Sequence, residues 1–221
     1  MRTPGAPGLF SQAGVDFPAM RLPPSAPGQR IGLFGGSFNP PHKGHRHVAL
    51  MALKRLSLDR VWWLVTPGNP MKRNDGLPPL PCRIAAATRL ARHPRMAVTG
   101  VEAALGVRYS ADAVRLLSER LPDRKLVWLM GADNLASLHR WQQWRDIAQR
   151  APIAVVDRPG ASLAALNAPA AAALARYRLR EADAHTLADA DPPAWVFLHV
   201  PLEPSSSTAL RSSVTVSPVA S

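Results

Sequence analysis

The chain has 221 residues, which is enough for one α/β domain with a sizeable core. Its 27 basic and 15 acidic residues give a formal charge of +12, an excess that attracts polyanions, with nucleic acid as the first candidate. No apolar run approaches the roughly 20 residues of a membrane-spanning helix, so we expect no membrane partner. Only four of the basic residues are lysines, and they are scattered without interleaved aromatics. We therefore interpret the charge as suited to small phosphorylated substrates and expect no nucleic acid.

Cys82 is the only cysteine, which excludes an internal disulfide framework and fits a reducing compartment. The N-terminus has no continuous apolar stretch that could act as a secretory signal. We therefore expect a cytoplasmic protein. A homo-oligomer is compatible with these features, and the sequence leaves that question open.

Residues 1–28 are rich in Pro, Gly, Ala and Ser without periodicity, which predicts a flexible extension. The alternative is an ordered arm that packs on a partner. The fold is expected to begin near Arg30, with residues 29–221 forming a single domain.

The first motif of the fold combines a strand, a glycine turn and a helix start. Residues 31–34 form a short apolar run, and Gly35 and Gly36 follow at once. Next come Asn39, two prolines and a His-x-Gly-His string, in which His42 and His45 share one face of the first helical turn. A helix N-terminus favours phosphate. Histidines could instead suggest a metal, but no acid or second thiol lies nearby to complete a zinc shell, so we assign no metal ligands.

Further along, apolar spacing predicts a helix over residues 43–56 and a buried strand over 61–65. Trp62 and Trp63 should point to opposite faces of that strand and pack in the core. A loop dense in Pro, Gly and Asn spans residues 66–81 and contains Lys72. For Lys72, a solvated side chain is the alternative to a functional one. A helix over 81–92 and a strand over 96–98 complete this half.

The middle of the chain repeats the pattern of strand, glycine turn and helix. A loop over residues 99–109 leads to Ser110, a plausible N-cap for a helix over 111–120. The apolar strand 125–130 runs into Gly131, after which Asp133 could bind ribose hydroxyls or cap a helix over 134–139. Trp141 and Trp144 are three residues apart, and packing in the core is the alternative to a ligand contact for both.

The last third contains two more strands, over residues 153–156 and 195–200. Between them, an alanine-rich stretch predicts a helix over 170–180 in which we find no chemistry. After the last strand, serine and threonine hydroxyls precede Arg211 at a probable helix start. Hydroxyls, free N–H groups and a guanidinium on one surface suit a triphosphate. The alternative is a serine-rich capping segment.

The alternation of strands and helical stretches predicts a Rossmann-like α/β fold, doubly wound, with a mainly parallel sheet and helices on both faces. Ligands of such sheets bind at the carboxyl ends of the strands. The candidate motifs all follow strands, so we expect them to meet at that edge.

The string Gly-Gly-Ser-Phe-Asn-Pro-x-His-x-Gly-His resembles the signature of the adenylyl- and cytidylyltransferase superfamily. Within it, the chain looks most like the bacterial nicotinate mononucleotide adenylyltransferases, from about Arg30 to Arg211. Other matches are Pro70-Met71-Lys72 after the second strand and the segment of residues 205–211. In that segment, Ser205 replaces the usual isoleucine.

The resemblance implies a role for each matching residue. The implied catalytic residues are His42, His45, Lys72 and Arg211. ATP binding is implied for Gly35, Gly36, Ser37, Phe38, Gly44, Gly131, Asp133, Ser206, Ser207 and Thr208. Acceptor binding is implied for Asn39, Tyr109, Ser110, Trp141 and Arg158, with Trp141 stacking on a nicotinate ring and Arg158 in a supporting role.

The implied reaction transfers AMP from ATP to nicotinate mononucleotide, with Mg²⁺ bridging phosphate oxygens. Histidines that face phosphates should favour their protonated form. Two alternatives remain: a related transferase with a pantetheine-phosphate or choline-type acceptor, and a non-catalytic nucleic-acid binder.

Overall fold

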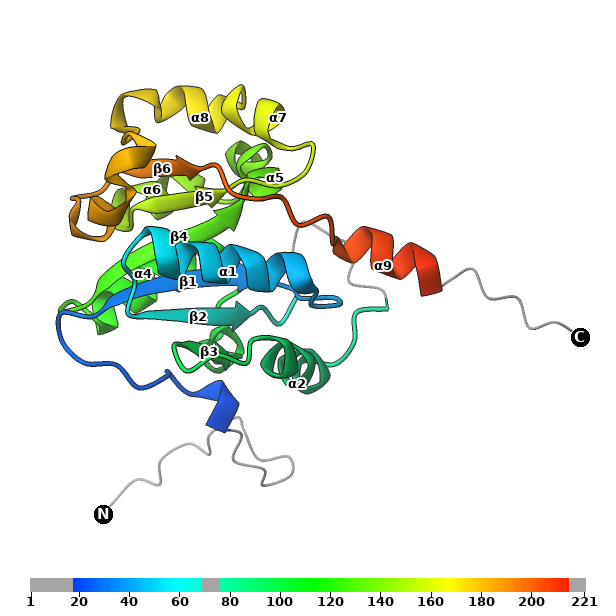
Figure 1. Ribbon diagram of the computed structural model, residues 1–221. Coiled ribbons are helices and arrows are strands. Elements are labelled where there is room, and N and C mark those ends of the chain that lie inside the picture. Colours follow the sequence, from blue (N-terminus) through cyan, green and yellow to red (C-terminus); the bar gives the residue numbers. More distant parts are fainter. Residues whose placement is uncertain (1–17, 69–75, 215–221) are drawn as a thin grey trace, which may run out of the picture.

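A computed structural model describes residues 18–68 and 76–214 and shows one six-stranded parallel sheet (Figure 1). The strands are β1 (Arg30–Gly36), β2 (Arg60–Val65), β3 (Met96–Thr99), β4 (Lys125–Gly131), β5 (Ile153–Val156) and β6 (Trp195–Leu198). Their order is β3-β2-β1-β4-β5-β6, and every pairing is parallel. The order reverses between β1 and β4, which is where such sheets bind ligands. The predicted Rossmann-like fold is confirmed.

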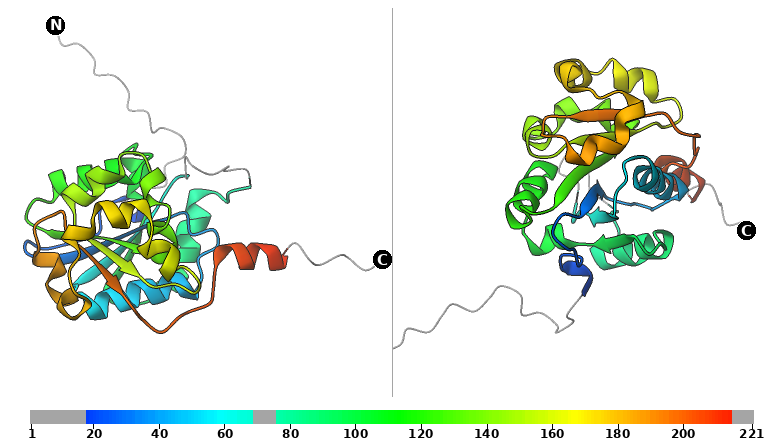
Figure 2. Two further views of the ribbon diagram at one scale, coloured as in Figure 1. Left: turned by 90° about the horizontal axis from the view of Figure 1, so that it is seen from above. Right: turned by 60° about the vertical axis from the view of Figure 1, so that its left-hand side comes forward.

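Helices cover both faces of the sheet (Figure 2). The α-helices are α1 (Lys43–Arg55), α2 (Leu80–Leu90), α3 (Val101–Ala104), α4 (Ser110–Arg120), α5 (Ala132–Leu135), α6 (Trp144–Arg150), α7 (Ser162–Leu166), α8 (Pro169–Ala173) and α9 (Ser207–Val214). The 3₁₀ helices are η1 (Pro18–Met20), η2 (Leu138–Arg140), η3 (Ala175–Tyr177) and η4 (Glu181–Asp189). Buried side chains of α4, α6 and α8 form one core layer, and those of α1, α2 and η4 form the other.

The second strand shows how the sequence builds the two layers. Trp62 belongs to the layer with α4, and Trp63 belongs to the layer with α1, as period-two alternation requires. Both side chains are fully buried. Continuous apolar runs therefore predicted these strands correctly, because a parallel sheet covered on both faces offers no polar side.

Three local predictions are wrong. In place of a helix over 134–139 that Asp133 could cap, the chain forms α5 and η2, and Gly131 holds the N-cap position of α5. Ser110 is the first residue of α4 rather than its N-cap; Tyr109 holds that position and makes no side-chain capping bond. The helix expected over 170–180 is broken into α8 and η3, with Leu174 between them. The indole Nε1 of Trp195 donates to the Leu174 carbonyl oxygen at 2.8 Å, so a tertiary contact satisfies a group at this break.

Residues 18–28 lie against the fold, whereas the expected extension reached residue 28. The Thr99 hydroxyl lies 3.0 Å from the Ala19 carbonyl oxygen and 2.8 Å from that of Arg21, and the Gly100 N–H donates to Ala19 at 2.7 Å. The guanidinium of Arg124 donates to the Ser25 carbonyl oxygen at 3.0 Å. This segment is therefore bonded to the end of β3 and to the residue that precedes β4.

In the described part of the chain, no helix has both the length and the apolar character needed to cross a bilayer.

Candidate active site

The two histidines of the glycine-turn motif lie against each other at the start of α1, with their rings tilted by 37°. His42 is the N-cap residue and His45 is the third helical residue, and their ring centroids lie 3.7 Å apart. The backbone N–H of His42 donates to Nδ1 of His45 at 3.2 Å. The expectation that both histidines share one face is confirmed.

This hydrogen bond fixes the tautomer of His45. Because Nδ1 accepts a proton-bearing group, the neutral imidazole carries its own hydrogen on Nε2. Nε2 is therefore a donor without any need for a net positive charge. His42 is buried, and its Nδ1 has no hydrogen-bond partner among the described residues.

Without bound nucleotide, both imidazoles favour the neutral form, so the protonated state expected beside phosphates stays a prediction. Burial and, to a smaller extent, the charge of Arg158 lower the pKa of His42 to about 4, while Asp133 and Glu203 act in the opposite direction. Burial, then His42 and Arg158, lowers the pKa of His45 to about 2. Desolvation disfavours the charged imidazole more than the nearby carboxylates favour it.

The aromatic rings of Phe34, Phe38 and Trp63 form a cluster that packs against the ring of His45. The ring centroid of Phe38 lies 5.0 Å from that of His45, and the Phe38 ring stacks on Trp63 at 5.0 Å. Phe34 contacts the same group, with its centroid 5.5 Å from that of Trp63. Phe38 has a φ of 46°, a left-handed conformation that is rare for a bulky residue, and its side chain is 1% exposed. Phe38 thus belongs to the core, which contradicts the ATP contact that the resemblance implied for its side chain.

Arg158 reaches from the end of β5 to the histidines. Its Nη2 donates to the Ser205 carbonyl oxygen at 2.9 Å. A methyl group on Gly44 would lie 2.5 Å from Nη1 of Arg158 and 2.8 Å from the Ser205 carbonyl oxygen, so only glycine fits there. The structure therefore places Arg158 beside the histidine pair, whereas the resemblance assigned it to the acceptor.

Two carboxylates act on His42. Asp133 follows the turn of Gly131 at the end of β4, and both it and Glu203 influence the pKa of His42. A methyl group on Gly131 would lie 2.4 Å from Asp133 Oδ1, so a larger residue there would displace this carboxylate. The Glu203 carboxylate accepts from the Ser205 hydroxyl at 2.6 Å.

The helix α9 lies beyond the carboxyl ends of the strands and contacts the loop that precedes the histidines (Figure 1). The Ser207 hydroxyl donates to the Pro40 carbonyl oxygen at 3.0 Å. The Arg211 guanidinium donates to the Asn39 carbonyl oxygen, and to the Thr208 hydroxyl at 3.3 Å. The structure thus brings the segment of Ser206, Ser207, Thr208 and Arg211 to the loop that leads into α1.

The glycines of the first turn have different surroundings. A methyl group on Gly35 would lie 2.6 Å from the indole of Trp128, and one on Gly36 would lie 3.2 Å from the ring of Phe38. Gly35 therefore makes room for a core tryptophan. Ser37 follows at the end of the turn, where its carbonyl oxygen accepts from Arg83 at 2.9 Å.

The residues expected to bind the acceptor are half-buried. Tyr109 and Ser110 lie at the start of α4, and Trp141 follows η2 and packs partly on the core layer that contains α4. Trp144 is 6% exposed, so of the two readings left open for it, packing in the core is the one the structure shows. Lys72 lies outside the described residues.

The sequence interpretation missed two groups, Arg83 and Glu203. Arg83 is 3% exposed and lies on the same face of α2 as Ile84 and Ala87. That i, i+1, i+4 spacing was the available signal, since it puts a charge on an apolar face. Glu203 gave no signal, because its place beside His42 depends on the path of the chain after β6.

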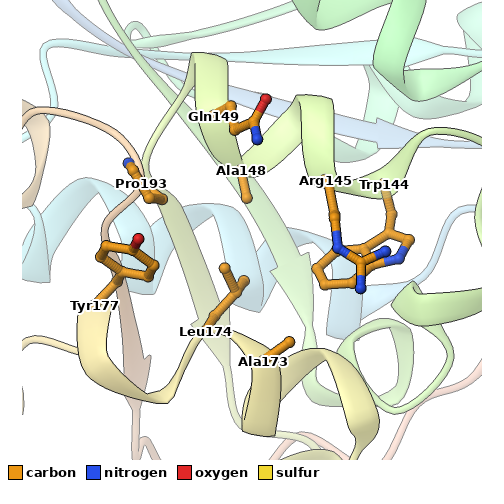
Figure 3. Close-up of a pocket in the computed structure, with 8 residues that line it drawn as sticks. All are labelled: Trp144, Arg145, Ala148, Gln149, Ala173, Leu174, Tyr177 and Pro193. Carbon is orange, nitrogen blue, oxygen red and sulfur yellow. The ribbon is translucent and has the colours of Figure 1, made fainter.

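Two cavities of modest size occur in the described part of the chain. One, of about 160 Å³, lies between α6 and η3, where Trp144, Arg145 and Tyr177 line it (Figure 3). The other, of about 100 Å³, lies between the loop of Phe38 and Asn39 and the start of α2. Only the second adjoins the histidine loop. In residues 18–68 and 76–214, no three His, Cys, Asp or Glu side chains are grouped so that they could hold a metal ion.

Comparison with known proteins gives the family. The family model described as cytidylyltransferase-like matches residues 33–213. Relatives from Bradyrhizobium sp. (strain ORS 278) and Methylorubrum extorquens (strain PA1) are 59% and 56% identical over 183 residues. These matches span 83% of this chain and 95% and 99% of the relatives, and both relatives are named probable nicotinate-nucleotide adenylyltransferase.

Among solved structures, the chain is similar in fold to the Plasmodium falciparum nicotinic acid mononucleotide adenylyltransferase. The complex with APC has a TM-score of 0.59 at 14% identity, and the complex with NaAD has a TM-score of 0.57 at 13% identity. Each match covers 83% of both chains. From the family model and the relatives together, this chain belongs to the cytidylyltransferase-like family and, within it, to the nicotinate-nucleotide adenylyltransferases.

Proposed function

We propose that the protein transfers AMP from ATP to nicotinate mononucleotide and releases pyrophosphate, a step in NAD biosynthesis. The observation that carries this proposal is the pair of adjoining rings of His42 and His45 at the N-terminus of α1, with Arg158 beside it. The relatives named above favour the nicotinate nucleotide over pantetheine-phosphate and choline-type acceptors. No feature of the site favours nucleic-acid binding.

The chemistry needs alignment and charge stabilisation rather than a base. An ionised phosphate oxygen of nicotinate mononucleotide attacks the α-phosphorus of ATP, and a new P–O bond forms. The bond between that phosphorus and the oxygen bridging to the β-phosphate breaks, and pyrophosphate leaves with the electron pair. The protein must hold both phosphates in line and stabilise the charge on their oxygens.

Each residue of the site then has a distinct task. The Nε2–H of His45 donates to the α-phosphate, and His42 faces the neighbouring phosphates. The free N–H groups at the start of α1 add donors, and Gly44 lets the backbone come close. Arg211 and Lys72 neutralise the remaining charge. Mg²⁺ brought in with ATP would neutralise part of the phosphate charge.

Placing Arg158 beside the histidines changes its task. Its guanidinium lies near enough to lower the pKa of both imidazoles, so it offers a fixed positive charge to an incoming phosphate. A phosphate there should raise both histidine pKa values again. Acceptor recognition is left to Trp141, by stacking, and to backbone N–H groups near Tyr109 and Ser110.

The test is a pyrophosphate-release assay with ATP and a panel of acceptors. Nicotinate mononucleotide should support turnover, and pantetheine phosphate and choline phosphate should not. Turnover only with one of the other acceptors would show that this acceptor, and not nicotinate mononucleotide, is the substrate. Salt-dependent RNA binding, with no pyrophosphate release in the presence of any acceptor, would indicate a nucleic-acid-binding protein in place of an enzyme. The single cysteine fits the reducing cytoplasm, where we place the reaction.

A further inference from the structure

Arg83 is a buried cation in the layer behind the glycine turn. It lies in the first half of α2, and its side chain is 3% exposed. Burial lowers the pKa of its guanidinium, which still stays charged because arginine does not deprotonate in proteins. Within residues 18–68 and 76–214, no carboxylate forms an ion pair with it. A buried charge without a counter-ion is costly, so its hydrogen bonds must compensate.

The guanidinium donates to four backbone carbonyl oxygens. Nη1 donates to Ser37 at 2.9 Å and to Thr66 at 2.7 Å. Nη2 donates to Pro67 at 3.0 Å, and Nε donates to Pro78 at 2.9 Å. These carbonyls belong to three segments: the end of the turn after β1, the end of β2, and the residues just before α2. One side chain therefore joins three loops at the carboxyl edge of the sheet.

The joined loops adjoin the phosphate-facing groups. Ser37 precedes Phe38, whose ring supports His45 with the centroids 5.0 Å apart. The Thr66 N–H donates to the Gly36 carbonyl oxygen at 3.0 Å, so the end of β2 is also bonded directly to the turn. A shift of Ser37 would therefore displace the Phe38 ring, against which the His45 imidazole packs.

We propose that Arg83 is a positioning residue for adenylyl transfer, which holds the turn after β1 and the end of β2 so that His45 meets the α-phosphate in line. This inference rests on the proposed function. Arg83 does not touch the substrate in this proposal; it acts through Ser37, Phe38 and the backbone of Thr66.

The geometry requires arginine in particular. A planar guanidinium directs its N–H groups in a fixed fork, which here spans carbonyls from separate loops. A lysine ammonium keeps the charge but has three donors at a single point. Arg83→Lys therefore separates the fork from the charge, and Arg83→Met removes both while retaining the bulk.

Arg124, at the amino ends of the strands, provides a matched control. Arg124 also donates to a backbone carbonyl, that of Ser25 at 3.0 Å, and it directly precedes β4. Arg124→Met should therefore lower the melting temperature without reaching the histidines.

The experiment compares wild type, Arg83→Lys, Arg83→Met and Arg124→Met in the full chain, with ATP and nicotinate mononucleotide, at a temperature where each variant is folded by circular dichroism. Misplacement of catalytic groups by a distant change costs up to about 100-fold in rate. We expect kcat of Arg83→Met to fall by about 10- to 100-fold while KM for both substrates changes by less than about three-fold. Arg83→Lys should stay at least about five-fold below wild type in kcat, and Arg124→Met within about two-fold of it.

Three outcomes would overturn the inference. Wild-type kcat in folded Arg83→Met would make Arg83 a purely structural clamp. Wild-type kcat in Arg83→Lys would mean that charge rather than the fork matters, and this comparison also decides the question if Arg83→Met does not fold. An equal fall in kcat for Arg124→Met would show that any loss of stability slows the enzyme. Inactivity of the wild type would instead count against the proposed function.

Discussion

At the scale of single residues, the site depends on where one proton lies. The His42 N–H takes up the Nδ1 lone pair of His45, so a neutral ring still presents a donor at Nε2. A neutral donor in a buried place needs no reorganisation when phosphate arrives, which is the condition for strong electrostatic stabilisation. The low pKa of His45 is therefore compatible with the proposed task.

Replacing His45 tests this assignment. His45→Ala should lower kcat by about 10²- to 10³-fold, the usual cost of losing one such donor, with little change in KM. His45→Gln, whose amide nitrogen can replace Nε2, should retain more activity than alanine does. The measurement is steady-state pyrophosphate release, with His185→Ala on η4 as the control, since His185 is exposed. Near-normal kcat in folded His45→Ala would remove His45 from the mechanism.

A buried carboxyl lies at the same edge of the sheet. Glu102 is 7% exposed, and burial raises its pKa from 4.5 to about 7, against a hydrogen bond from the side chain of Thr66. The folded state thus binds the proton more tightly than the unfolded state does. The contribution of the protonated form to stability is complete below about pH 4.5 and is lost as the pH rises through about 7.

Glu102→Gln should remove this pH dependence. At pH 8 the variant should be more stable than wild type, by an amount on the order of 3 kcal/mol, and near pH 4.5 the two should be alike. Urea unfolding across this pH range measures the difference. Glu119→Gln, on an exposed face of α4, should leave the profile of the wild type unchanged. Parallel profiles for Glu102→Gln and wild type would contradict the buried, protonated carboxyl.

At the scale of elements, the turn between η2 and α6 separates two tryptophans that the sequence spaces like a helix. Trp141 lies half-buried after η2, while α6 begins at Trp144, which is buried. Gln143 between them has a φ of 50°, so the chain bends and the two indoles have different surroundings. That difference makes them a natural pair for comparison.

Trp141→Ala should raise KM for nicotinate mononucleotide and for its amide analogue alike. Loss of a stacking partner costs about 1–3 kcal/mol, and stacking does not distinguish acid from amide, so the ratio of the two KM values should hardly change. Trp144→Leu is the control, which should lower the melting temperature and leave both KM values alone. If Trp141→Ala left KM for the acid untouched, Trp141 would be a core residue and the acceptor site would lie elsewhere.

The segment at residues 18–28 is an element that composition did not reveal. The Thr99 and Gly100 contacts to Ala19 and Arg21 are tertiary, so Pro- and Gly-rich sequence alone predicted a flexible extension. Deleting residues 1–28 should lower the melting temperature by several degrees, because these bonds to the end of β3 are lost. Deleting residues 1–17 should change it little. Equal melting temperatures for both deletions would show that the arm contributes nothing to stability.

The strands could be predicted and the irregular parts could not, for physical reasons. The strands that contain Trp62, Trp63 and residues 153–156 could be recognised as continuous apolar runs, because both faces of a parallel sheet are apolar. Arg83 and Glu203 take their roles from loops that meet only in the folded chain. The break at Leu174 depends on the Trp195 indole, and the place of Arg158 depends on Gly44 lying opposite it. Family motifs found the histidines, but their charge state required knowledge of burial.

At the scale of the whole molecule, the formal charge of +12 acts on every anionic substrate. Such a field steers ATP toward the protein and is screened by salt. We expect kcat/KM for ATP to fall as the ionic strength rises from about 0.01 to about 0.15 M, while kcat stays nearly constant. Assays in NaCl and in potassium glutamate separate screening from specific chloride binding. A salt-independent kcat/KM would mean that the charge lies too far from the site to matter.

The order of the strands also has a consequence for synthesis. β1 lies between β2 and β4, and its pairing with β4 joins Arg30 to Lys125. A ribosome therefore delivers β1, α1, β2, α2 and β3 well before the partner for the second edge of β1 emerges. Until then, an unpaired strand edge and the apolar surface awaiting α4 face the solvent, and such intermediates attract chaperones and other chains. The reversal that creates the ligand site is thus the point at which the nascent protein is most vulnerable.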